Sequence, residues 1–229
     1  MVLAAVFVAS LLVTAFGGGT TRGPVSLAAA TYVSDQPNVQ TRPYPEIVAV
    51  RGPVRLQMPV SQTRVTAIGY HAAGDGAVQL APSGHQANEG LLQRVFHSVF
   101  GGNGGGPGWY QLGGGTTSAL DVGAPVGTNV YSPVDGTVVA ISPYVVGGKR
   151  YGSQIDIQPE NAPSVVVSLT QLKADPSLSV GSTVVSGARK LGTVVDLAAV
   201  ERQALARYTN DAGNHVTLEL RPAASIALD

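Results

Sequence analysis

The second half of the chain alternates short apolar segments with glycine-containing turns, and this pattern constrains the fold more than any other feature. Segments with β-strand character occur at residues 129–131, 136–142, 154–157, 164–169, 183–185 and 215–220. Short strands at regular spacing, separated by glycine-rich turns, are typical of antiparallel sheets and sandwiches. We therefore predict a mainly β domain over residues 116–229.

One or two accessory helices are expected. Asp196 is a suitable N-cap residue, and the residues that follow it place four side chains on one helical face: Leu197, Val200, Ala204 and Tyr208. Residues 88–100 carry an apolar stripe at helical spacing that stops at Gly101 and Gly102. This second helix belongs to an accessory region over residues 61–115, between a strand predicted at 62–70 and a glycine-rich loop.

Residues 1–16 read MVLAAVFVASLLVTAF and contain no charged side chain. The apolar run is shorter than the roughly twenty residues that a membrane span needs, and no basic residue precedes it, as one would in a secretory signal. Three interpretations stay open: a short membrane anchor with the remainder outside the membrane, a signal cleaved near residues 28–30, and a buried core helix. Either of the first two places the rest of the chain beyond a membrane.

Residues 17–60 show little periodicity and hold six of the 15 prolines. A stretch of this kind buries too little apolar surface to offset the entropy lost on ordering. We predict an extended tether here.

Composition excludes some partners and sites. Fourteen Lys and Arg balance 14 Asp and Glu, so the chain lacks the basic surplus that phosphate backbones require, and nucleic acid is not expected as a partner. The chain has no cysteine, which rules out disulfides and thiolate metal ligands.

Three motifs occur in order over about a hundred residues. The first is Leu120-Asp121-Val122 followed by GTNVYSPVDGTVV at 127–139, the second is VGSTVVSG at 180–187 followed by Leu191-Gly192, and the third is GNHVTLEL at 213–220. Together they resemble the β-domain of LytM-type (M23) metallopeptidases, also called the duplicated hybrid motif. Lipoyl-type domains share a P-x-D-G-x-V hairpin, but neither Lys173 nor Lys190 lies in the tight-turn motif that they would need.

The resemblance implies a zinc site, and most of its histidines are replaced here. The family's H-x-x-x-D pair reads Thr117 to Asp121, so only the carboxylate remains. In the closing H-x-H, the first histidine is retained as His215, but Thr217 replaces the second, which is the metal ligand in the family. Gln171 takes the place of a further family histidine. A threonine hydroxyl is a poor zinc ligand, so we expect no bound zinc, no other cofactor and no hydrolysis.

Several polar residues are nevertheless expected to line a groove. His215, Thr217 and Glu219 alternate with Val216, Leu218 and Leu220, so the two sets face opposite sides of a strand. The candidate lining residues are Asp121, Tyr131, Gln171, His215, Thr217 and Glu219. His71, Asp75 and His85 are close in sequence and would rebuild a metal site only if their loop crossed the groove, whereas such residues are more often solvated turn residues.

The resemblance implies a catalytically inactive LytM-like module outside a bacterial membrane, binding peptidoglycan or a cell-wall hydrolase. Two alternatives stay open: a zinc endopeptidase with an atypical ligand set that cleaves cell-wall peptides, and a purely structural secreted β-domain. This functional step rests on analogy, because one fold supports many functions.

Overall fold

The structure is a computed structural model, and it describes residues 41–74, 76–89 and 106–223. It is built almost entirely from β-strands, with two short 3-10 helices, η1 (Gln62–Arg64) and η2 (Ala204–Arg207), in the described ranges. The predicted mainly β fold is therefore confirmed.

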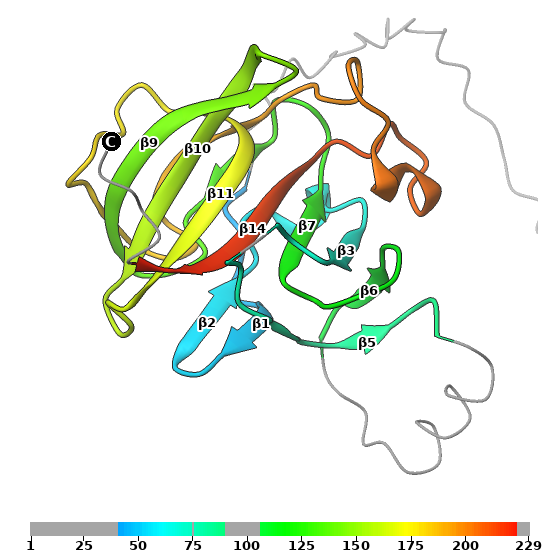
Figure 1. Cartoon of the computed structure of the whole chain (residues 1–229), viewed down its shortest axis with the longest axis horizontal. Helices are drawn as coiled ribbons and strands as arrows, with labels where there is room; N and C mark the ends of the chain where they lie inside the picture. Colours follow the sequence, from blue (N-terminus) through cyan, green and yellow to red (C-terminus); the bar gives the residue numbers. More distant parts are fainter. Residues whose placement is uncertain (1–40, 75, 90–105, 224–229) are drawn as a thin grey trace, which may run out of the picture. The chain divides into compact units, whose positions relative to one another are not determined.

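One large sheet forms the body of the fold (Figure 1). Its neighbouring strands are, in order, β12 (Thr183–Val184), β9 (Gly136–Val146), β10 (Lys149–Pro159), β11 (Val165–Ala174), β14 (His215–Pro222), β7 (Ala119–Gly123), β3 (Ile68–His71), β6 (Gly108–Gln111) and β5 (His85–Gln86). A side branch adds β13 (Lys190–Val194), which pairs with β11 and with β8 (Asn129–Tyr131). Most pairs are antiparallel as predicted, but β6 pairs in parallel with both β3 and β5.

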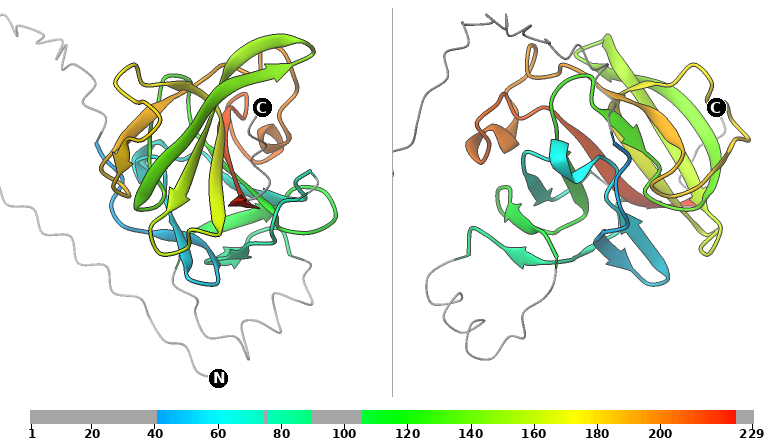
Figure 2. Two further views of the ribbon diagram at one scale, coloured as in Figure 1. Left: turned by 60° about the vertical axis from the view of Figure 1, so that its left-hand side comes forward. Right: turned by 180° about the vertical axis from the view of Figure 1, so that it is seen from behind.

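The strands β9 and β10 form a long hairpin, and Figure 2 shows that it bends strongly along its length. Gly147 and Gly148 make its two-residue turn with φ of 56° and 78°. Positive φ at both central positions is the geometry that matches the twist of paired strands. The predicted strand segments at 129–131, 136–142, 154–157, 164–169, 183–185 and 215–220 all overlap observed strands, several of which extend further.

A second, three-stranded sheet contains residues that the sequence assigns to the tether. It consists of β1 (Ile47–Arg51) between β2 (Val54–Gln57) and β4 (Ala81–Pro82). Val48, Leu56 and Met58 are at most 1% exposed and belong to the main hydrophobic core. The tether prediction is therefore wrong from β1 onward, because apolar residues between the prolines are buried in the core. Residues 17–40 lie outside the described ranges.

Two predicted elements also differ from the structure. Residues 62–70 are not one strand, since η1 precedes the shorter β3. The helix predicted after Asp196 stops after one turn, with the Glu201 amide bonded to the Leu197 carbonyl. Gln203 is then extended (φ −82°, ψ 135°), which lets the chain bury Leu205 at a separate place. The helix expected at 88–100 and the segment at 1–16 lie outside the described ranges, apart from residues 88 and 89.

In the described part of the chain, no helix is long and apolar enough to cross a membrane.

A candidate binding groove

Two rows of side chains cross the centre of the large sheet and form the floor of a groove. In the first row, Thr170 of β11 lies opposite Thr217 of β14, which lies opposite Asp121 of β7. In the second row, Ser168 lies opposite Glu219 on the same strands. Because side chains two residues apart share a face of a strand, both rows point to the same side of the sheet.

The apolar residues that alternate with these rows build the core. Val216 and Leu218 are fully buried and Leu220 is 1% exposed, and all three lie in the main core cluster. The predicted division of this strand into a polar groove face and an apolar core face is confirmed.

Asp121 is the buried centre of the site, at 3% exposure. Its Oδ1 accepts a hydrogen bond of 2.7 Å from the Thr217 hydroxyl, and its Oδ2 lies 3.2 Å from Nε2 of His71. Nε2 of His215 lies 3.5 Å from Oδ1. Burial opposes ionisation of this carboxyl, but the charges of His215 and His71 and the bonds from His71 and Thr217 outweigh it, so the pKa of Asp121 lies below its usual value.

His71 reaches Asp121 from the neighbouring strand. In the pairing of β3 with β7, Gly69 lies opposite Asp121, so His71 is the diagonal neighbour on the same face. Its Nδ1 lies 2.8 Å from the Ala72 carbonyl oxygen. Two acceptors on the two ring nitrogens favour the doubly protonated ring, and the hydrogen bond to Asp121 is the largest of the effects that raise the pKa of His71 from 6.5 to about 9.

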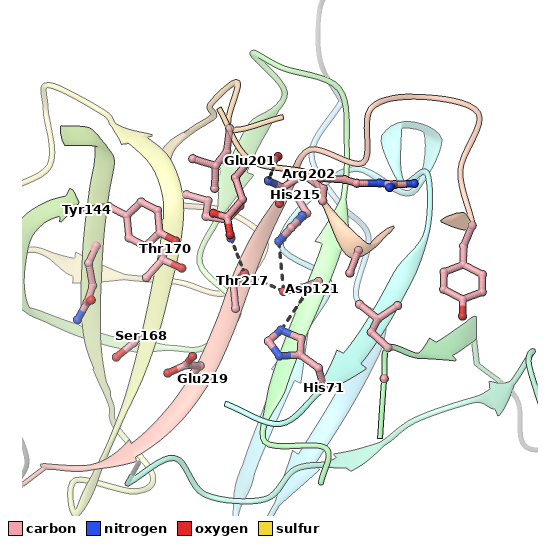
Figure 3. A pocket seen from close by; sticks show the side chains of 18 of the residues that line it. His71, Asp121, Tyr144, Ser168, Thr170, Glu201, Arg202, His215, Thr217 and Glu219 are labelled. Carbon is pink, nitrogen blue, oxygen red and sulfur yellow. Dashed lines mark hydrogen bonds and ion pairs between the residues drawn. The ribbon is translucent and has the colours of Figure 1, made fainter. Parts of the chain in front are cut away.

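A second set of hydrogen bonds extends this cluster. The Gln171 side-chain amide donates to the Thr217 hydroxyl oxygen at 3.1 Å, and that hydroxyl in turn donates to Asp121. Nδ1 of His215 lies 2.8 Å from the Gly213 carbonyl oxygen, which holds the ring with Nε2 toward Asp121. Figure 3 shows His71 and His215 on either side of Asp121, with Thr217 beside it.

The cluster lies at the bottom of a cavity of about 750 Å³. Tyr144 and Gln154 of the β9–β10 hairpin line one side, and Arg202 and Arg207 of the segment 197–208 line another. Figure 3 shows Tyr144 and Arg202 on opposite sides of the Asp121 cluster.

The wall formed by residues 197–208 is held at three places. The Asn214 side-chain oxygen accepts hydrogen bonds from the Leu197 and Ala198 amides. Leu205 is fully buried in a small cluster with Ala67 and Leu112. The ring of Tyr208 stacks on Tyr110 with centroids 4.2 Å apart.

The structure brings together most of the residues that the sequence singles out. Five of the six expected groove residues line the cavity: Asp121, Gln171, His215, Thr217 and Glu219. Tyr131 is buried on β8 and does not line it. Thr117 does not line it either, since its hydroxyl donates to the Leu80 carbonyl at 2.6 Å.

Of the three residues considered for rebuilding a site, one joins Asp121. His71 does so, against the expectation that it is a solvated turn residue. His85 lies on β5 and does not line the cavity, and Asp75 is outside the described ranges. Sequence reasoning also missed Tyr144, Arg202 and Arg207, and no motif marks them.

The positions that correspond to zinc ligands in the resembled family do not fit zinc in this chain. Gln171 and Thr217 offer a neutral amide and a neutral hydroxyl, and both groups are bonded to each other or to Asp121. Across the described residues, no group of three or more His, Cys, Asp or Glu is arranged to hold a metal ion.

No protein-family model matches the chain, and no curated protein matches it. Among solved structures it is similar to the M23 metalloprotease Pseudoalterin from the deep sea, at 15% identity and a TM-score of 0.40, over 75% of this chain and 72% of that one. It is also similar to Helicobacter pylori Csd3, at 17% identity and a TM-score of 0.38, over 73% of this chain and 32% of that one. The match to lysostaphin has 17% identity and a TM-score of 0.35, over 48% of this chain and 38% of that one.

The chain thus spans about a third of the Csd3 and lysostaphin chains. These similarities concern the fold alone, and they do not indicate an activity. The mainly β fold that the LytM resemblance implies is the fold that the structure shows.

Proposed function

We propose that this chain is a LytM-like module of the bacterial cell envelope that binds its ligand in the groove without hydrolysing it. The observation that carries the proposal is that the Asp121 carboxylate already has protein partners. Both of its oxygens are engaged by protein side chains, namely Thr217 and His71. The carboxylate therefore holds the site together, and a metal ion would have to compete with these bonds for its oxygens.

The replaced positions support the same conclusion. A hydrolytic zinc site needs three protein ligands and one open position for water. Thr217 and Gln171 stand where the resembled family has histidines, and their hydrogen bonds lock them into the cluster. Metal binding there would have to break this buried network, which costs free energy because the partners would be left unpaired.

The groove keeps the properties of a binding site. Its volume lies within the range of ordinary ligand sites, and its lining includes charged groups of both signs, such as Arg202, Arg207 and Glu201. Peptidoglycan or a cell-wall hydrolase would be the ligand, and residues 1–16 would tether the domain outside the membrane or direct its secretion. These assignments follow from the sequence resemblance and stand as part of the proposal.

A retention assay tests the binding function. The purified full-length chain is incubated with insoluble peptidoglycan, pelleted and quantified. A Thr170→Trp variant fills the floor of the groove and should lose retention. The matched control is Thr183→Trp, because Thr183 is an exposed strand residue outside the groove. Equal retention of both variants would contradict binding in the groove. If the wild type is not retained, peptidoglycan is excluded as the ligand, and the remaining functions are binding of a protein partner and a purely structural role.

A second candidate function is a zinc endopeptidase that uses a rearranged ligand set. His71 and His215 both present Nε2 toward Asp121, at 3.2 and 3.5 Å. Ligand atoms bound tetrahedrally to one zinc ion at about 2 Å lie roughly 3.3 Å apart, and each separation is close to this value. The two distances go to different oxygens of Asp121, and the described residues are not arranged as a metal site, so zinc binding would require the side chains to move. Elemental analysis of the purified chain after zinc loading and washing decides between the candidates. Stoichiometric zinc that is lost in His71→Ala would favour the peptidase, and its absence would favour the binding module.

A further inference from the structure

Gln171 has a strained backbone at the centre of the groove. Its φ is 64°, and it is the only non-glycine residue with positive φ among those the structure describes. In this left-handed region a side chain is disfavoured and glycine is the usual choice. Strain of this kind is kept where the surrounding structure enforces it, commonly at functional sites.

The strain has an identifiable origin in the sheet. Ser153 pairs with Leu172 and Ile155 with Leu169, so β11 contains one extra residue between these pairs. Up to Thr170, β11 pairs with β14, and from Leu172 it pairs with β13. Gln171 is the bulge residue at which the strand changes partner, and bulges are known to redirect a side chain.

The Gln171 side chain is only half satisfied. The residue is 8% exposed and lines the groove. Its Nε2 donates to the Thr217 hydroxyl oxygen, but its Oε1 is buried and has no hydrogen-bond partner in the structure. A 180° flip of the amide would not help, because the single Thr217 hydroxyl proton is already donated to Asp121. No described group donates to this oxygen, which is also closed to solvent, so a donor from outside the protein reaches it only when the amide turns toward the groove.

Two costs thus meet on one residue, a left-handed backbone and a buried acceptor without a donor. Glycine would remove both, so stability does not account for a glutamine at this position. Two neighbouring residues on the same strand offer further polar groups to a ligand. The hydroxyls of Ser168 and Thr170 face the groove and make no hydrogen bond to another described residue.

We propose that Gln171 binds the ligand of this groove directly. Its Oε1 accepts a hydrogen bond from a backbone N–H of a bound peptide. Ser168 and Thr170 are two residues apart on one strand, a spacing of roughly 7 Å that matches the repeat of an extended peptide. Their hydroxyls can donate to peptide carbonyls while Gln171 accepts from the N–H. The inference deepens the proposed binding function and selects the peptide part of an envelope ligand over its sugar part.

The experiment uses a neutral capped trialanine amide, which presents backbone groups without charge. It is compared with three analogues in which one amide N–H at a time is replaced by an ester oxygen. Binding to the full-length chain is followed by chemical-shift titration. The variants are Gln171→Gly and Gln171→Asn, and the control is Gln158→Ala, whose exposed amide donates to the Pro163 carbonyl away from the groove.

The wild type and the Gln158→Ala control should bind the trialanine amide and lose about tenfold in affinity for one of the ester analogues, as expected for one lost hydrogen bond. Gln171→Gly should bind the amide about tenfold more weakly, discriminate no ester, and unfold at the same or a higher urea concentration than the wild type. If Gln171→Gly fails to fold, Gln171→Asn serves instead, because asparagine tolerates the left-handed region but is too short to reach.

Several results would overturn the inference. They are equal affinity of the wild type for the amide and all esters, ester discrimination that persists in Gln171→Gly, and no binding of trialanine at all. Retention on peptidoglycan is measured in parallel. If the wild type is retained but does not bind the peptide, the binding function stands and the role of Gln171 fails. If the peptide binds with the expected ester pattern but peptidoglycan is not retained, the role of Gln171 stands and peptidoglycan is excluded as the ligand.

Discussion

Raising the pH should weaken the fold through one residue, His71. Its ring is held as a cation between the Asp121 carboxylate and the Ala72 carbonyl, and its pKa is raised from 6.5 to about 9. A raised pKa means that the folded state binds the proton more tightly than the unfolded state. The stabilisation is therefore complete below pH 6.5 and is lost as the pH rises through about 9.

The size of the effect follows from the pKa and the exposure. Each pKa unit corresponds to about 1.4 kcal/mol, so the proton adds at most about 3.5 kcal/mol to the free energy of unfolding. The His71 side chain is 33% exposed, and solvent screens a partly exposed pair. We therefore expect about 1 to 2 kcal/mol.

The assay is urea unfolding of the wild type and of His71→Gln at pH 6 and pH 10. The single tryptophan is a suitable reporter, because Trp109 packs edge-on against the buried Tyr70 ring at 5.1 Å. Other groups that titrate in this range contribute equally to both proteins, so the wild-type advantage at pH 6 should shrink by about 1 to 2 kcal/mol at pH 10. An advantage that stays constant between the two pH values would refute the ion pair of His71 with Asp121.

Three further substitutions test the core, the close approach of two strands and the cluster by urea unfolding. Leu218→Ala should lower the free energy of unfolding by about 2 to 5 kcal/mol, because the side chain is fully buried; a loss below 1 kcal/mol would contradict its place in the core. Gly136→Ala should cost about 1 to 3 kcal/mol, since its new Cβ would lie 2.2 Å from the Gln158 carbonyl oxygen, whereas Gly74→Ala meets nothing within 4 Å and should be nearly neutral. Asp121→Ala should cost about 2 to 4 kcal/mol, because the pair with His71 is lost and the buried Thr217 hydroxyl loses its acceptor, and a neutral result would show that the cluster is not coupled to stability.

The strand positions and the polar face of β14 followed from sequence because they depend on local rules. Side chains alternate along a strand, so the positions of Thr217 and Leu218 on opposite faces could be predicted from the apolar pattern. The turn at Gly147 and Gly148 likewise reflects a local need for positive φ.

At two places, packing of apolar side chains in the core overrode the local sequence pattern. The apolar spacing after Asp196 favours a helix, but Leu205 is buried in its own cluster with Leu112, and the chain leaves the helical path after one turn to reach it. Prolines around β1 and β2 indicate a tether, yet Leu56 and its neighbours fill the core. A propensity is worth a few tenths of a kcal/mol per residue, whereas burying one large apolar side chain is worth about 1.5 to 3 kcal/mol.

By itself, the sequence determined the mainly β fold, the order of the motifs, and the presence of Thr117, Gln171 and Thr217 where the resembled family has histidines. Only the tertiary structure brought His71 to Asp121, because that contact depends on the register between strands 50 residues apart in sequence. It also placed Gln171 on a bulge with a left-handed backbone, since the strain arises where one strand changes partners. Strand pairing and partner exchange join residues that are far apart in sequence, so the pattern within one strand does not reveal which strand lies beside it.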